Sequence, residues 1–366
     1  MYEFETISDM LNYYYRDQEM IGVGKEELRK ALLTTTTGRF NTVYGPKAFS
    51  QLNQETNLFG MLPKFTSKNK GYRAYTERPS DIKNGTAEGG ALAAADNDTW
   101  AQITVPDKTQ QLTYQYSEIL ALRQGKDDIM DIDEVRRLYM IYHIEGLEEA
   151  LNTDGNTLAG DNFDSIDRIT ASSAQATAHS WTSGREDIYG IDRSSNSWAD
   201  AVAKHNSGTD RDLTLGLVRD TLYAAKEEGA RTNLMMTGYD TYNALINLLD
   251  TKQRFTSMIV NVGAKGVQPA APAQSGTSVL TFDGVPVMPN PRTQKDTISR
   301  IYMLDTTDTD GVGVPRLGIR LLRPPTNIES NDFIKVGSFA IKGNFSTVGE
   351  LYCRALHKQA SLRDLK

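Results

Sequence analysis

A helical repeat of apolar residues runs through the middle of the chain. Four side chains occupy positions i, i+3, i+4 and i+7 of one helix face: Val135, Leu138, Tyr139 and Tyr142. Asp131 and Glu134 have the spacing of a capping box, and the Asp-Gly-Asn sequence that begins at Asp154 ends the repeat. The pattern predicts one long helix over residues 131–152, about 30 Å in length at 1.5 Å per residue.

Alternating apolar and polar residues precede this helix. The alternation occupies residues 101–105 and 112–116, and it follows a Gly- and Ala-rich stretch, Gly85–Ala95, that has few side chains able to anchor a core. The simplest arrangement is a long polar β-ribbon. Because a ribbon of this kind is marginally stable alone, we expect it to find its partner on another chain. Residues 1–60 carry scattered apolar residues with no sustained period, which indicates an extended arm.

From residue 210 onward the pattern is typical of an α/β region. Leu215, Val218 and Leu222 mark a helix, Gly229 stands where its C-terminal cap belongs, and a buried strand is expected at 233–236. A second helix follows from residue 240. The pair Asp283-Gly284 between two apolar runs predicts a β-hairpin, and further strands are expected at 301–304 and in the last 50 residues.

Composition excludes several classes of protein. The chain has 366 residues, 40 Lys and Arg, 47 Asp and Glu, and a net charge of −7. This acidic balance argues against tight non-specific binding of nucleic acid, and no apolar run approaches the ~18 residues that a membrane span requires. The length suggests about two domains. A single cysteine, Cys353, rules out an internal disulfide bond.

Motifs for catalysis or cofactor binding are absent. The sequence has no phosphate-binding loop, no histidine pair at metal-ligand spacing and no nucleophile elbow. The best metal-like cluster consists of Asp154, Asp161, Asp164 and Asp167. Since it departs from the EF-hand pattern, we interpret it as a solvated turn after the helix, and we predict no metal, no cofactor and no catalytic residue.

Charge is unevenly distributed along the chain. Residues 61–83 have a net charge of +4, whereas residues 131–190 have a net charge of −8. Two solvated faces would explain this pattern, but the basic ribbon of one subunit lying over the acidic helix region of its neighbour would explain it as well. The second hypothesis gives six candidate inter-subunit contacts: Lys64, Lys68, Lys70, Arg73, Arg78 and Lys83.

The order of these elements resembles that of the major capsid proteins of tailed bacteriophages and tailed archaeal viruses. The resemblance covers about residues 40–366 and includes Leu151–Ile169, which is similar to the glycine- and aspartate-rich turn of that family. It implies an α+β Hong Kong 97-like capsid fold. The implied parts are an N-terminal arm (1–60), an E-loop β-ribbon with its flanks (61–126), a P-domain (127–209) with its spine helix at 131–152, an α/β A-domain (210–310) and a return to P-domain strands (311–366).

The resemblance also implies a function without catalysis. Members of the family assemble into hexamers and pentamers of an icosahedral shell, the virion capsid, in the host cytoplasm. The shell encloses double-stranded DNA without sequence-specific binding and without a membrane. The implied partners are further copies of the chain, a separate scaffolding protein, a portal protein and, in some members, decoration proteins.

Two alternatives stay open at this point. A nanocompartment shell resembling the encapsulins would use the same fold around a cargo enzyme. A metal-dependent α/β hydrolase or phosphotransferase that uses the cluster from Asp154 to Asp167 belongs to a different class of protein.

Overall fold

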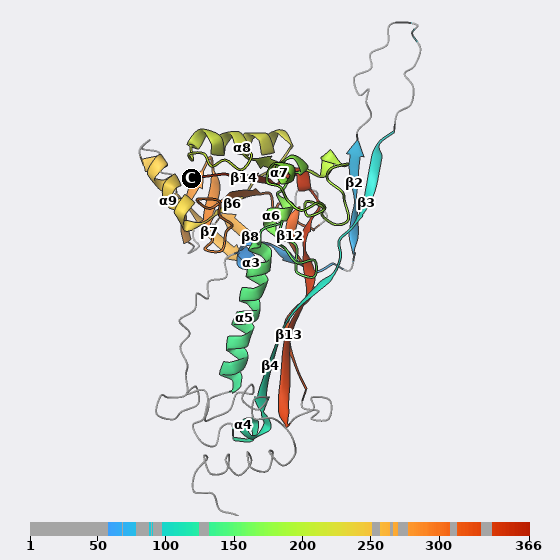
Figure 1. Ribbon diagram of the computed structural model, residues 1–366, viewed down its shortest axis with the longest axis vertical. Helices are drawn as coiled ribbons and strands as arrows, with labels where there is room; N and C mark the ends of the chain where they lie inside the picture. Colours follow the sequence, from blue (N-terminus) through green and yellow to red (C-terminus); the bar gives the residue numbers. More distant parts are fainter. Residues whose placement is uncertain are drawn as a thin grey trace, which may run out of the picture. The chain divides into compact units, whose positions relative to one another are not determined.

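A computed structural model describes residues 58–67, 69–77, 88, 90, 97–123, 132–250, 257–263, 266–269, 277–307, 313–330 and 339–366. The expected N-terminal arm up to residue 57 and most of Gly85–Ala95 lie outside these residues. The described helices are α3 (Leu58–Met61), α4 (Glu118–Arg123), α5 (Ile132–Asn152), α6 (Ile166–Ile169), α7 (Ser173–Ala178), α8 (Leu215–Glu227) and α9 (Tyr239–Asp250), with short 3₁₀ turns at Ser197–Ala199 and Leu356–Lys358 (Figure 1). The long central helix is confirmed as α5.

The described strands form three sheets. The first is two-stranded and pairs β2 (Gly71–Glu77) with β3 (Thr99–Thr104). The second has the order β1 (Lys64–Phe65), β12 (Leu317–Ser330), β13 (Ala340–Cys353) and β4 (Lys108–Ser117). The third has the order β5 (Val202–Lys204), β14 (Ala360–Leu362), β11 (Ile301–Leu304), β6 (Leu234–Thr237), β10 (Val285–Pro289), β9 (Thr277–Phe282), β7 (Ser257–Gly263) and β8 (Gly266–Pro269).

The predicted β-ribbon exists, but its strands differ in part from the expected ones. β3 contains the alternating segment at 101–104, and it pairs with β2, which lies before the Gly- and Ala-rich stretch. The second alternating segment, 112–116, lies in β4, which belongs to the sheet of β13 instead. Alternation alone identifies a strand with one buried face, and it does not identify the strand's partner.

The chain divides into two compact units. Among the described residues, the first contains residues from Gln111–Glu145 and Pro324–Thr347, and the second contains the rest of Glu55–Gln110, Gly146–Arg323 and Val348–Lys366. Within the described residues, no helix has the length and apolar character that crossing a membrane requires.

The core of the first unit is aromatic. The ring of Tyr114 lies 5.6 Å from that of Phe345 and 5.0 Å from that of Tyr139, measured between centroids. Arg136 donates two hydrogen bonds to Glu329, at 2.7 and 2.6 Å, and this pairing lowers the pKa of Glu329 to about 2. The buried members of the cluster are Tyr114, Tyr116, Leu120, Ile132, Val135 and Phe345.

The core of the second unit lies between its helices and the eight-stranded sheet. Val218, Leu222 and Ala225 form the buried face of α8, which lies along β14 (Figure 1). The predicted hairpin is confirmed: Asp283 and Gly284, both with positive φ, join Phe282 to Val285.

A strand at the end of the chain is confirmed as β14, which lies between β5 and β11, in the sheet that holds β6 and β10. All three residues of β14 are buried, and α8 packs against this strand. A three-residue strand of this kind carries no alternation that would reveal its place.

A buried arginine organises the loop after α5. Arg193 is 1% exposed, and its guanidinium donates to the main-chain oxygens of Arg168, Ile169 and Ala171, which lie at the end of α6. Burial lowers the pKa of Arg193 to about 10, so the group is still charged at neutral pH.

Replacing this side chain tests its role. We expect Arg193→Met to lower the free energy of unfolding by about 3 kcal/mol, because three buried carbonyl groups lose their donor. Urea denaturation at neutral pH measures the change. Arg137→Met, at an exposed ion pair with Glu134, is the control and should cost under about 1 kcal/mol. Equal denaturation midpoints for Arg193→Met and the wild type would contradict this role.

Candidate functional site

The ribbon of β2 and β3 holds part of the predicted inter-subunit cluster. Of its six members, Lys64, Lys70 and Arg73 are described, while Lys68, Arg78 and Lys83 lie outside the described residues. The Lys64 ammonium lies 4.6 Å from the centroid of the Phe59 ring, and burial lowers its pKa. The Lys70 side chain is 71% exposed and lies 3.5 Å from the Asp107 carboxylate. The structure therefore gives these three cations different surroundings, and Lys70 and Arg73 are the exposed ones.

Arg320 binds the two strands of the ribbon at the end where β2 begins and β3 ends. Arg320 of β12 is fully buried and donates to the main-chain oxygen of Asn69 at 2.8 Å and to that of Val105 at 3.2 Å. It also forms an ion pair with Asp107. Asn69 precedes β2 and Val105 follows β3, so one side chain binds both strands at the same end of the antiparallel ribbon. We call Asn69, Val105, Asp107 and Arg320 the ribbon base.

Main-chain and aromatic contacts complete the ribbon base. The Val105 amide donates to the Lys70 oxygen at 2.7 Å. The Tyr72 hydroxyl donates to the Cys353 oxygen at 2.8 Å, and its ring lies 5.5 Å from that of Tyr352. A Cβ atom on Gly71 would lie only 2.2 Å from the main-chain oxygen of Ile103 on the paired strand, so this position of β2 requires glycine. These contacts hold the ribbon base against β12 and β13.

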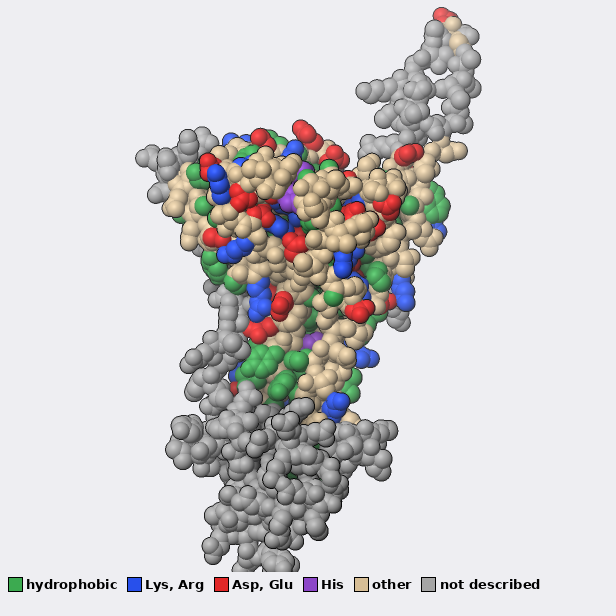
Figure 2. Space-filling model, viewed as in Figure 1, with side chains coloured by type: hydrophobic (Ala, Val, Ile, Leu, Met, Phe, Trp, Pro, Cys, Tyr) green, Lys and Arg blue, Asp and Glu red, His purple; other side chains and the backbone are tan. Residues whose placement is uncertain are grey.

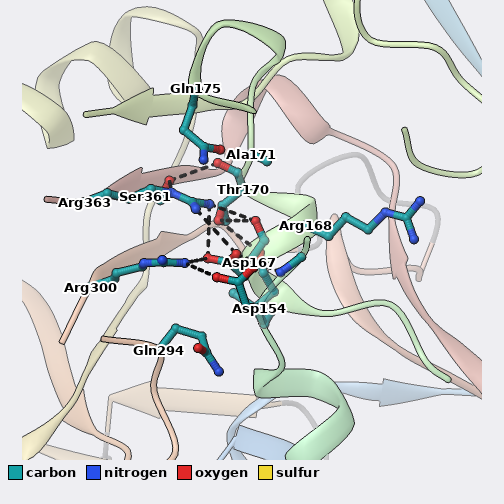
Figure 3. A network of polar contacts seen from close by, with 12 residues as sticks. Asp154, Asp167, Arg168, Thr170, Ala171, Gln175, Gln294, Arg300, Ser361 and Arg363 are labelled. Carbon is teal, nitrogen blue, oxygen red and sulfur yellow. Dashed lines mark hydrogen bonds and ion pairs between the residues drawn. The ribbon is translucent and has the colours of Figure 1, made fainter. Parts of the chain in front are cut away.

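The four aspartates of the candidate metal cluster do not come together. Asp167 is fully buried, and its carboxylate faces Arg300 at 2.9 Å and Arg363 at 3.1 Å (Figure 3). Asp154 shares Arg300 at 3.1 Å. Asp161 is exposed, and Asp164 belongs to a different cluster. Among the described residues, no group of three or more His, Cys, Asp or Glu side chains is arranged to hold a metal ion.

The charge of Asp167 is stabilised by every group around it. Burial opposes ionisation, but Arg363, Arg300, the Tyr302 hydroxyl at 2.6 Å and the Gly155 amide at 3.0 Å outweigh it. Together they hold the pKa of Asp167 well below its usual range. Arginines therefore take the places beside this carboxylate that a cation would need.

Asp164 lies in a second buried cluster. The Lys108 ammonium lies 3.2 Å from the Asp164 carboxylate and 2.9 Å from that of Glu350, and Arg168 also reaches Asp164 at 3.2 Å. Burial raises the pKa of Glu350 above its usual range, and the charge of Asp164 adds to this effect. The cluster joins the start of β4 to the loop after α5 and to β13.

The acidic excess of residues 131–190 is partly internal. The Glu148 carboxylate is fully buried and accepts hydrogen bonds from the Leu58 and Phe59 amides at 2.9 and 2.6 Å, which caps α3. The carboxylates of Glu148, Asp164 and Asp167 are thus buried and paired within the chain, so they cannot form ion pairs with another subunit. On the face drawn in Figure 2, acidic and basic side chains of the described residues are interspersed. The predicted contrast between a basic and an acidic surface is therefore weaker than the sequence suggested.

Sequence reasoning missed the arginines that pair with these carboxylates. Arg300 and Arg363 lie 133 and 196 residues from Asp167 along the chain. Arg320 lies 251 residues from Asn69. No local motif connects such positions, and the only available signal is that arginines occur within apolar strand patterns, as Arg320 does between Ile319 and Leu321.

Removing the charge of Asp167 tests the first cluster. Its depressed pKa means that ionised Asp167 stabilises the fold above about pH 4, the value for an unfolded aspartate, and that this stabilisation is lost as the pH falls further. We expect Asp167→Asn to lower the free energy of unfolding by about 3–5 kcal/mol at pH 7. The difference from the wild type should shrink below pH 4. Asp161→Asn is the control, and a constant difference from pH 7 to pH 2 would contradict the account.

Comparison with known proteins gives matches in structure and none in sequence. No protein-family model matches the chain, and no curated protein matches it. The capsid of cyanophage A-1(L) matches 90% of this chain and 98% of its own, with a TM-score of 0.61 at 14% identity. The capsid of the native GTA particle matches 92% of this chain and 100% of its own, with a TM-score of 0.54 at 12% identity. The capsid of the empty GTA particle matches 86% of this chain and 98% of its own, with a TM-score of 0.51 at 13% identity.

These matches extend over 86–92% of the chain. At 12–14% identity they concern the arrangement of the chain and not its chemistry. The α+β chain therefore has the Hong Kong 97-like fold of the major capsid proteins of tailed phages.

Proposed function

We propose that this chain is a structural shell protein, the major capsid protein of a tailed virus, and that it assembles with copies of itself. The observation that carries the proposal is the match to the cyanophage A-1(L) capsid over 90% of the chain. In this proposal the subunits form hexamers and pentamers of an icosahedral virion capsid around double-stranded DNA, after assembly in the host cytoplasm. The chain has no catalytic role in it.

The ribbon supports this proposal independently of the comparison. Its residues Arg73, Tyr75, Trp100, Gln102 and Thr104 are exposed, although a two-stranded sheet gains little stability in water by itself. An element of this kind is stabilised when it packs on a further subunit. The ribbon, with its flanks, is then the E-loop, α5 is the spine helix of the P-domain, and the sheet of β6 and β10 lies in the A-domain.

The net charge of the chain agrees with a container for DNA. At −7, the chain has no overall attraction for a phosphate backbone, which suits a shell that has to release its genome. A scaffolding protein, a portal protein and decoration proteins are proposed partners of this shell.

A nanocompartment shell is the second candidate, because it would use the same fold. The contents of purified particles separate the two functions. Nuclease-protected DNA would favour the virus capsid, and a co-purifying enzyme would favour the nanocompartment.

The basic ribbon gives a direct test of self-assembly. Lys70 is exposed and its ion pair with Asp107 is worth under about 1 kcal/mol. We therefore expect Lys70→Glu, combined with Lys68→Glu, to impair assembly in light scattering while the circular dichroism and melting temperature of the monomer stay unchanged. Lys226→Glu on α8 is the control for net charge. Unaffected assembly of the ribbon variant would contradict the role of these cations.

A further inference from the structure

The side chain of His143 joins α5 to β13 inside the first unit. It is 4% exposed, and its Nε2 atom lies 2.8 Å from the Thr347 hydroxyl. Its ring stacks on that of Phe345, with 6.3 Å between the centroids. Phe345 and Thr347 are two residues apart on β13, as residues on one face of a strand are. His143 is therefore a buried, titratable group at the contact between the long helix and this strand.

The neighbours of His143 suit an uncharged ring. The Thr347 hydroxyl can donate to a neutral imidazole or accept from it, but it carries no charge of its own. Among the described residues, no charged side chain contributes to the ionisation of His143, and burial alone lowers its pKa. His179 of the second unit differs in this respect, because its ring lies 2.7 Å from the Asp364 carboxylate.

The other titratable groups of this core do not compensate a charge on His143. Burial raises the pKa of Tyr114 and Tyr116 on β4, so both phenols are neutral at physiological pH. The Glu329 carboxylate on β12 is held by Arg136 at 2.6 Å. None of the described carboxylates on these elements forms an ion pair with the His143 ring. The remaining ionisable side chains described on the elements of the first unit are Glu118 on α4, Asp133, Glu134, Arg137, Tyr139, Tyr142 and Glu145 on α5, and Lys342 on β13.

A proton on His143 would therefore be a buried charge without a partner. Moving a charged group from water into such a site is costly, so the folded chain binds this proton less well than the unfolded chain does. An unfolded histidine has a pKa of about 6.5. Neutral His143 thus stabilises the fold fully above about pH 6.5, and this stabilisation is lost as the pH falls through the lowered pKa of the folded state.

We propose that His143 forms an acid-sensitive contact between α5 and β13, which is made while the imidazole is neutral and is broken when the ring takes up a proton. Breaking it exposes the ring to water and removes its packing on Phe345 and its hydrogen bond to Thr347. The proposal concerns a single chain and goes beyond the shell function. It does not rest on that function, so its failure would leave the shell function standing.

Hydrogen exchange at the imidazole rings tests the first step in the wild-type chain. The rate at which the Cε1 hydrogen of each histidine exchanges with deuterium, followed by mass spectrometry from about pH 4 to about pH 9, gives the midpoint of its titration. We expect the midpoint of His143 in the folded chain to lie below its midpoint in urea. A folded-state midpoint equal to or above the one in urea would overturn the proposal.

Exchange of the backbone amides tests the consequence. Between about pH 7 and about pH 5, we expect the protection of α5 and of residues 343–347 to fall several-fold in the monomeric wild type, after correction for intrinsic exchange. His143→Gln keeps a neutral polar side chain at this position and should remove most of that change. His357→Gln is the matched control and should behave like the wild type, because burial also lowers the pKa of His357, but this residue lies on the 3₁₀ turn of the second unit.

A second variant keeps the test decisive if His143→Gln packs poorly. Thr347→Val removes the hydroxyl and leaves the ring in its buried site, so the acid-dependent loss of protection should persist in it. The same loss of protection in His143→Gln as in the wild type would overturn the proposal, and so would protection in Thr347→Val that does not change with pH.

Discussion

The Arg320 guanidinium is the group on which the geometry of the ribbon depends. It donates to Asn69, two residues before β2, and to Val105, directly after β3, and it does so from a fully buried position on a different sheet. A charge in that position is stable because Asp107 and two carbonyl oxygens surround it. Since a two-stranded ribbon has no core of its own, its direction has to be set at its base. The ribbon base therefore connects the folding of the chain to whatever the ribbon binds.

Buried arginine–carboxylate pairs recur through the second unit and serve the same purpose. Asp167 holds Arg300 and Arg363 from distant parts of the chain, and Asp305 holds Arg316 at 2.6 Å. Removing one partner of such a pair leaves a buried charge without compensation, so each pair fixes the position of the segments that it joins. Part of the acidic excess of residues 131–190 is therefore internal, because buried carboxylates such as Asp164 and Asp167 position loops and strand ends.

The elements that the sequence predicted well are those with a local signal. The apolar stripe of α5, the Asp283-Gly284 turn and the buried faces of α8 and α9 each depend on neighbours within a few residues. The position of β14 and the partner of β3 depend on pairings across most of the chain, which periodicity does not encode. The aspartates at 154–167 were interpreted as a solvated turn, and Asp154 does lie in a turn, but Asp167 is a buried ion-pair centre because its arginines come from elsewhere. Of the six basic residues assigned to a subunit contact, the exposed Lys70 and Arg73 are the described ones still suited to that role.

Negative-stain electron microscopy of the purified chain, with light scattering alongside, tests the central claim most directly. The account predicts closed shells, tubes or rings of capsomers, because a two-stranded ribbon gains little stability in water by itself and is stabilised when it packs on a further subunit. A compact monomer at every concentration, with residues 61–126 resistant to proteolysis, would contradict it. In that case the ribbon would be stable without a second subunit.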